Sequence, residues 1–320
     1  MAFKIFNDPI EGALFVLILV CTPIVVLVTT LRVVTSLKNH RTLSTEDYLA
    51  VLASLINLAY NALEMWTITV MNGVPVLSIT KLPYPTLVKI LKVGYFIDFM
   101  FPLNQTFSKL SLLLLYYRIF SINKTFSTMV FVVAAIQTCW GISMFFARVF
   151  ACTPIYHFWD RLAPGTCISG NGLLVGPEIV NSLLDFVMVG MAIWIVQKLN
   201  MSTKYKRKLS ILFALGCITG IIGFVKIGVA YDSIGNNGID AVWDVLQMCA
   251  SNICCCIPIY KVLLPKTNVL KSLGSKLFSK SSWKSSTSSN MGNSSHVQQQ
   301  WVHLDESSMH ELAGVRGSNF

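Results

Sequence analysis

The chain has 320 residues, of which 54% are hydrophobic and only 12% are charged. Soluble domains carry about 25% charged residues, so this composition excludes an ordinary soluble fold and makes the bilayer the solvent for much of the surface. The formal net charge of +10 would also suit nucleic-acid binding, but the positions of Lys and Arg along the chain favour a membrane surface and no nucleic acid.

The first apolar segment runs from Gly12 to Val34 and follows Lys4, as the apolar part of a signal peptide follows a basic residue. Its length, however, is about the 20 residues that cross a bilayer, and no small-residue cleavage site comes after it. We therefore expect a retained first transmembrane helix, preceded by a short extracytosolic segment, residues 1–11.

Six further apolar segments follow in the chain. They predict an all-α fold, a seven-helix transmembrane bundle occupying residues 12–265, with no visible internal repeat. The predicted later spans cover residues 47–70, 88–117, 127–150, 172–197, 208–230 and 240–263.

Basic residues set the expected orientation of these spans. With the N-terminus outside, 17 of the 25 Lys and Arg residues fall in cytosolic segments and 6 in outer ones, a bias that the positive-inside rule predicts. The C-terminus is then cytosolic. One of the N-x-[ST] sequons lies in a span and three are cytosolic, so we expect no glycosylation at any of them: Asn104, Asn123, Asn200 and Asn293.

The C-terminal region reads as two cytosolic segments. Residues 266–284 place leucines and a phenylalanine on one helical face with lysines elsewhere, which is typical of a basic amphipathic juxtamembrane helix on anionic lipid. Residues 285–320 are Ser-rich, lack apolar content and are expected to be disordered. A basic loop before the sixth span is a candidate site for a cytosolic signalling partner, although topology also demands such a loop: Lys204, Lys206, Arg207 and Lys208.

Polar residues inside the spans recur at helical spacing, so each set shares one face of its helix. Charged groups in a span normally face the bundle interior. The sets are Asn57, Asn61 and Glu64 in span two; Asp98, Gln105 and Lys109 in span three; Glu178, Asn181 and Asp185 in span five; Lys226 in span six; and Asp244, Gln247 and Ser251 in span seven.

Depth along the helices, counted at about 1.5 Å per residue, places the carboxylates in the outer half, with Lys226 as their counter-ion. We therefore predict an outward-facing polar cavity that binds a ligand. Interhelical hydrogen bonds worth about 0.6 kcal/mol each are the alternative reading for any single residue. The predicted ligand-binding residues are Asn61, Glu64, Asp98, Glu178, Asn181, Asp185, Lys226, Asp244 and Gln247.

The cysteines carry a structural rather than a metal-binding signal. The nine cysteines form no CxxC pair and no Cys/His metal spacing, so we expect no metal site. Cys152 and Cys167 lie in an outer loop, an oxidising setting that favours a disulfide over two buried thiols. Cys254, Cys255 and Cys256 read as small packing residues, with palmitoylation as the alternative.

Five pieces of sequence, in order, resemble the fungal rhodopsin-domain integral membrane family, the satratoxin-cluster membrane-protein family. They are the acidic pair Glu46–Asp47 after a basic first loop; FSKLSLLLLYYRIF at the end of span three; Cys152, Pro154, Trp159 and Cys167 of the outer loop; Asn181 and Asp185 of span five; and KRKLSILFALG before span six. Span five departs from the family by lacking a proline in VMVGMAIW, and Gln247 stands where an acid is common.

The resemblance implies two settings. Some relatives look like G-protein-coupled receptors that sense surface cues, and others are encoded beside secondary-metabolite genes. The family name suggests retinal, but a Schiff base needs a lysine near the middle of span seven, where none precedes Lys261. We therefore expect no retinal and no other cofactor.

Two function classes remain open, with a transporter ranked behind them for lack of repeats. The first is a receptor-like protein that binds a small lipophilic molecule in the outer cavity. The alternative is a membrane-embedded cyclase or isomerase acting on a polyketide or terpenoid intermediate. Such an enzyme needs a protonated carboxyl to start the reaction, and its candidates are Glu64, Asp98, Asp185 and Asp244.

Overall fold

Helices account for most of the residues that the structure describes. The structure is a computed structural model that describes residues 8–38, 43–74, 78–79, 82–121, 123–160, 162–198, 216–229 and 237–262, all within the unit Met1–Lys266. The predicted juxtamembrane segment, the tail, the basic loop and the sequons at Asn200 and Asn293 lie outside these residues.

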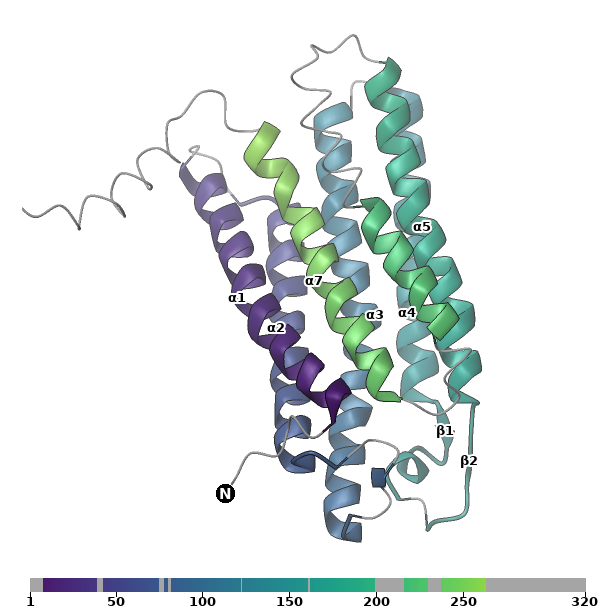
Figure 1. Ribbon diagram of the computed structural model, residues 1–320. Coiled ribbons are helices and arrows are strands. Elements are labelled where there is room, and N and C mark those ends of the chain that lie inside the picture. Colours follow the sequence, from purple (N-terminus) through teal and green to yellow (C-terminus); the bar gives the residue numbers. More distant parts are fainter. Residues whose placement is uncertain are drawn as a thin grey trace, which may run out of the picture. The chain divides into compact units, whose positions relative to one another are not determined.

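The helices alternate in direction and pack side by side (Figure 1). They are α1 Pro9–Lys38, α2 Thr45–Met71, α3 Tyr84–Phe120, α4 Lys124–Val149, α5 Gly170–Lys198, an apolar helix Gly216–Val229 and α7 Asn237–Val262. An all-α fold is thereby confirmed, and each predicted span overlaps a helix. Four helices are long and apolar enough to cross a membrane by length and composition: α1, α2, α4 and the Val175–Ile195 part of α5.

Local sequence explains several helix ends. The Asp47 carboxylate accepts a 3.3 Å bond from the Ser44 backbone N–H, which is half of a capping box at the start of α2. That helix ends at Asn72, whose φ of 46° closes it in the left-handed conformation. Asn123 caps α4 by accepting from the Phe126 backbone N–H at 3.3 Å, so this sequon asparagine serves as an N-cap.

Two apolar clusters hold the helices together. One joins α1, α2, α3 and α7 around Tyr60 and Met248. The other joins α3, α4, α5 and α7 and contains Cys254, Cys255 and Cys256, which are at most 6% exposed. Their burial favours packing over palmitoylation.

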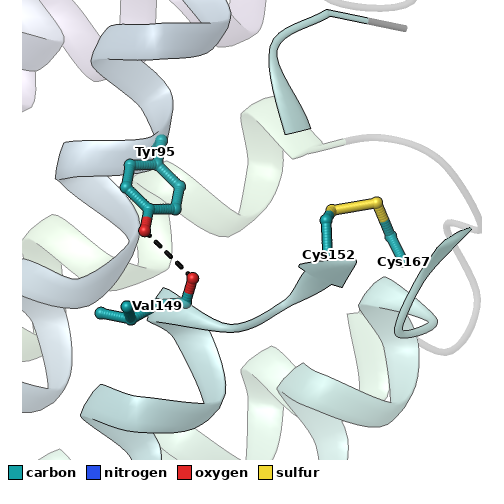
Figure 2. Close-up of a disulfide and its surroundings, with 4 residues drawn as sticks. All are labelled: Tyr95, Val149, Cys152 and Cys167. Carbon is teal, nitrogen blue, oxygen red and sulfur yellow. Dashed lines mark hydrogen bonds between the residues drawn. A yellow bond between two sulfur atoms is a disulfide. The ribbon is translucent and has the colours of Figure 1, made fainter. Parts of the chain in front are cut away.

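A short two-stranded hairpin lies between α4 and α5. Strands β1 (Cys152–Thr153) and β2 (Thr166–Cys167) pair antiparallel, and a disulfide joins Cys152 to Cys167, as predicted. Figure 2 shows this disulfide close to the end of α4, where the Tyr95 hydroxyl donates to the Val149 carbonyl at 3.0 Å. The end of the molecule that carries these strands is called the hairpin end below.

Aromatic and polar contacts fasten the same loop onto α3. Tyr95 packs edge-on against Phe158, which belongs to the 3₁₀ helix η3 (Ile155–Phe158), and against Trp159. The Tyr84 hydroxyl donates to Asp160 at 2.5 Å, and this hydrogen bond lowers the pKa of the exposed carboxyl. Aromatic contacts and a hydrogen bond therefore attach the loop to α3, and the disulfide closes the loop on itself.

Helices α3 and α4 approach closely at Gly141. A Cβ atom there would overlap Thr106 Oγ1 and lie 3.0 Å from Thr106 Cγ2. The Thr106 hydroxyl donates to the Pro102 carbonyl at 2.7 Å, and a β-branched side chain has few alternative rotamers in a helix. Only glycine fits this crossing without displacement.

We expect Gly141→Ala to lower the free energy of unfolding by about 1–3 kcal/mol, because an added methyl overpacks the crossing. SDS-induced unfolding in mixed micelles, followed by tryptophan fluorescence, measures the change. Gly94→Ala on α3 is the control, since its Cβ meets nothing within 4 Å. Thr106→Ala should restore much of the loss, and a Gly141→Ala protein as stable as the parent contradicts the prediction.

Candidate functional site

Lys226 is the centre of a buried charged cluster in the hairpin half of the molecule. It comes from helix Gly216–Val229, is 2% exposed, and places Nζ 2.5 Å from Asp244 Oδ1 on α7 and 3.5 Å from Glu178 Oε2 on α5. The same ammonium lies 4.4 Å from the centre of the Phe101 ring. A cation–π contact of this kind stabilises a desolvated charge.

Glu178 also accepts two hydrogen bonds from amides. Gln247 Nε2 donates to its Oε1 at 2.7 Å and Asn181 Nδ2 at 3.0 Å. The other amide atom of Gln247, Oε1, is buried and has no partner among the residues that the structure describes. Since a carboxylate only accepts, the amide nitrogen must face Glu178, and the orphan atom is the carbonyl oxygen.

Three further carboxyl groups complete what we call the hairpin-side cluster. Asp98 on α3 forms an ion pair with Arg148 on α4. Glu64 on α2 lies beside the Tyr60 hydroxyl and is near enough to Asp244 for the two charges to interact. Asp240, one turn before Asp244, interacts electrostatically with both basic side chains. The cluster comprises Glu64, Asp98, Arg148, Glu178, Lys226, Asp240, Asp244 and Gln247.

A second ion pair lies nearer the middle of the helices. Lys109 Nζ on α3 is 3.0 Å from Asp185 Oδ1 on α5, and it donates to the Asn181 backbone and side-chain oxygens at 2.9 and 2.6 Å. All three residues are at most 5% exposed. The second oxygen of Asp185, Oδ2, is buried and finds no hydrogen-bond partner within the described part of the chain.

A small cavity adjoins this pair. Its volume, ≈ 20 Å³ for the centre of a water-sized sphere, exceeds the roughly 10–15 Å³ that one water molecule needs. Its walls carry hydroxyl groups and apolar side chains together: Ser108, Lys109, Leu112, Tyr116, Asp185, Met188, Val189, Gly216, Thr219, Ser251 and Cys254. A water molecule there would have Asp185 Oδ2 as an acceptor.

The predicted site residues thus divide between two places. Glu64, Asp98, Glu178, Lys226, Asp244 and Gln247 meet in the hairpin-side cluster, Asp185 joins Lys109, and Asn181 contacts both. Asn61 donates to Thr22 on α1 at 3.0 Å and to Asn57 at 3.2 Å. Of the predicted ligand-binding residues, only Asp185 lines the cavity, and ligand binding by the set stays a prediction.

Lys226 neutralises fewer carboxylates than the sequence suggested. It pairs with Glu178 and Asp244, whereas Asp185 pairs with Lys109 and Asp98 with Arg148. The pairing of Arg148 with Asp98 was not predicted from the sequence. The place of Arg148 in the last turn of an apolar helix, where it can reach back along α4, was the available signal.

A third polar network, at the end opposite the hairpin, was also missed. The Arg32 side chain of α1 is fully buried and donates to Asp47 Oδ1 at 3.0 Å, to the Cys255 carbonyl at 2.6 Å and to the Glu46 carbonyl at 2.9 Å. It therefore joins α1, α2 and α7. The acidic pair Glu46–Asp47, noted for the family resemblance, is half of this network.

The site residues do not suit a metal ion or retinal. Within the described ranges no group of three or more His, Cys, Asp or Glu side chains could hold a metal ion. Lys226 lies outside α7 and is engaged by two carboxylates. The lysine of α7, Lys261, stands one residue before the helix ends. Neither lysine is therefore placed to form a retinal Schiff base near the middle of α7.

Long apolar helices with charges paired in the interior define a helical membrane protein. Residues 31–266 match the fungal rhodopsin domain family, and the chain belongs to that family. It is a multi-pass integral membrane protein.

Several relatives extend over much of the chain. Satratoxin biosynthesis SC1 cluster protein 4 of Stachybotrys chartarum is 37% identical over 236 residues, which cover 68% of this chain and 88% of the relative. Wortmanamides biosynthesis cluster protein C of Talaromyces wortmannii is 34% identical over 269 residues, covering 83% of this chain and 74% of the relative. No solved structure matches the chain.

Proposed function

We propose that this protein is a seven-helix, receptor-like membrane protein that binds a small lipophilic molecule among its buried polar residues, without retinal, and that serves a secondary-metabolite pathway. The hairpin-side cluster carries the proposal. Among the described residues it gathers five carboxyl groups around two cations and leaves Gln247 Oε1 unpartnered. Packing alone rarely needs such a surplus of buried charge, because each desolvated ion is costly.

The proposed topology has seven spans, with the N-terminus outside and the C-terminus in the cytosol. Helices at all seven predicted places and the concentration of basic residues in the predicted cytosolic segments support it. Helices α3 and α7 direct buried polar side chains into ion pairs and hydrogen bonds with their neighbours, as interior spans would. A C-terminal tag that reacts from outside intact cells would contradict this arrangement.

The pathway part of the proposal draws on the relatives. Two of them bear names that place them in the satratoxin and wortmanamides biosynthesis clusters. Similarity over most of those proteins supports an equivalent setting for this chain, and the ligand would then be a metabolite of such a pathway.

A membrane-embedded cyclase or isomerase is the second candidate. The observation that favours it is Glu64, a buried carboxyl beside the Tyr60 hydroxyl with no ion-pair partner among the described residues. A carboxyl in that position could deliver a proton to a polyketide or terpenoid intermediate. Deletion of the gene should then cause an uncyclised precursor to accumulate, whereas a binding protein leaves the product pattern intact.

Native mass spectrometry of protein purified from membranes of its own organism tests the binding proposal. We expect a non-lipid small-molecule adduct on the parent protein and its loss from the Glu178→Gln/Asp244→Asn variant. Asp160→Asn, which changes an exposed loop carboxyl, is the matched control and should keep the adduct. Identical spectra for all three proteins, with lipid adducts only, would refute binding at the cluster.

A further inference from the structure

We infer that the hairpin-side cluster selects ligands that carry a protonated amine, and that Glu64 is the residue that holds the ammonium group. The inference rests on the proposed binding function and names its ligand class. It begins from charge: the described cluster has five carboxyl groups but only Lys226 and Arg148 as cations. A cationic ligand reduces this surplus, and an anionic ligand increases it.

Glu64 is a buried acid of this cluster without a cation beside it among the described residues. Its side chain is buried, no ion pair reaches it from the described residues, and the Asp244 carboxylate lies near enough to interact with it. Lys226 forms its ion pairs with other acids, because its ammonium lies 2.5 Å from Asp244 and 3.5 Å from Glu178. An ammonium group near Glu64 would therefore meet an acceptor that no protein cation serves.

Hydrogen-bond chemistry points the same way, independently of charge. Gln247 Oε1 is an acceptor without a donor, and its side chain is 0% exposed. Asn61, one turn from Glu64 on α2, has a second unpartnered buried acceptor in Oδ1. These atoms need N–H or O–H groups. An ammonium supplies three donors and no acceptor, so it can donate to acceptors of this kind.

The surroundings favour an organic cation over a bare metal ion. The Phe101 ring already lies 4.4 Å from the Lys226 ammonium, so an aromatic face accepts positive charge in this cluster. Tyr60, 2% exposed, supplies apolar ring surface beside Glu64, and the described residues form no metal-binding group.

Part of the hairpin-side cluster is exposed. The Asp98, Arg148 and Asp244 side chains remain 28%, 17% and 19% exposed, whereas Glu178 and Lys226 are 4% and 2% exposed. Exposure therefore decreases from the Asp98–Arg148 pair toward Lys226.

Three compounds of the same shape and different charge test the inference: 1-adamantylamine, 1-adamantanol and adamantane-1-carboxylate. Their binding to the full chain in lipid nanodiscs is measured by equilibrium dialysis at pH 7, with empty nanodiscs subtracted. We expect the amine to bind at least about tenfold more tightly than the alcohol, and the carboxylate most weakly. Glu64→Gln should abolish the preference, and Glu64→Asp should retain it.

Asp160→Asn is again the control and should leave the preference unchanged, since its carboxyl lies in the loop. Equal binding of amine and alcohol, or tighter binding of the carboxylate, overturns the inference. The binding proposal itself is tested separately, by the native mass spectrometry described above. An amine preference that survives in Glu64→Gln overturns the role of Glu64. A melting temperature of the variant near that of the parent excludes misfolding as the cause of a loss.

Discussion

Replacing Lys226 by Met should lower the free energy of unfolding by about 3–5 kcal/mol, because removing one partner of a buried ion pair leaves the other charge uncompensated. Here the ammonium serves two buried acceptors, Glu178 Oε2 at 3.5 Å and Asp244 Oδ1 at 2.5 Å. SDS-induced unfolding in mixed micelles measures the loss. Methionine keeps the length of the side chain, so the change reports on charge more than on volume.

Two further variants make the Lys226 result interpretable. Lys92→Met removes an ammonium that lies 5.7 Å from the Trp159 ring centre on the exposed loop, and it should cost only about 0.5–1 kcal/mol. Adding Glu178→Gln and Asp244→Asn to Lys226→Met should recover much of the stability. If Lys226→Met is no less stable than Lys92→Met, the ion pairs do not have the structural role assigned to them.

The second large effect is expected at the opposite end of the molecule. Arg32→Met removes the guanidinium that faces Asp47 and three hydrogen bonds that join α1 to α2 and α7. We expect a loss of about 3–5 kcal/mol, since the group is fully desolvated. The same unfolding measurement applies, and the double variant Arg32→Met/Asp47→Asn should be more stable than the single one because it removes the buried charge.

Arg118 provides the matched control for Arg32. Its guanidinium pairs with Glu46 Oε1 at 2.8 Å, but its side chain is 42% exposed, and exposed ion pairs contribute about 0–1 kcal/mol. Arg118→Met should therefore change stability little. Equal losses for the Arg32 and Arg118 variants would mean that burial does not set the strength of these pairs.

Much of the fold could be predicted from the order of residues. Apolar segments about as long as a bilayer is thick identified every described α-helix, because length and composition are properties of a continuous segment. The disulfide was also predictable, since Cys152 and Cys167 lie in one short loop. Helical spacing placed Glu178 and Asn181, and Asp244 and Gln247, on common faces, and the structure directs both pairs into one cluster.

The ends of the helices were harder to predict from the sequence. The structure begins α3 at Tyr84 and ends it at Phe120, several residues beyond the predicted span at its start. The preceding Pro83 and the loop contact of Tyr84 with Asp160 help to place this end. A span predicted from hydrophobicity alone takes no account of such contacts. The predicted length of a helix is therefore too short when its first turns project past the apolar region.

The pairing of buried charges is the feature that local sequence patterns predict least. That Lys226 and the carboxyl groups predicted inside the spans needed compensation followed from their place in apolar segments, because desolvated charge is costly wherever it lies. Which cation met which acid depended on the lateral order and rotation of helices far apart in the chain. Arg148 therefore reaches Asp98, Lys109 reaches Asp185, and Arg32 reaches Asp47. Membrane class, helix positions and polar faces are local properties that the residues specify directly, whereas the ion pairs arise only when packing brings separate helices together.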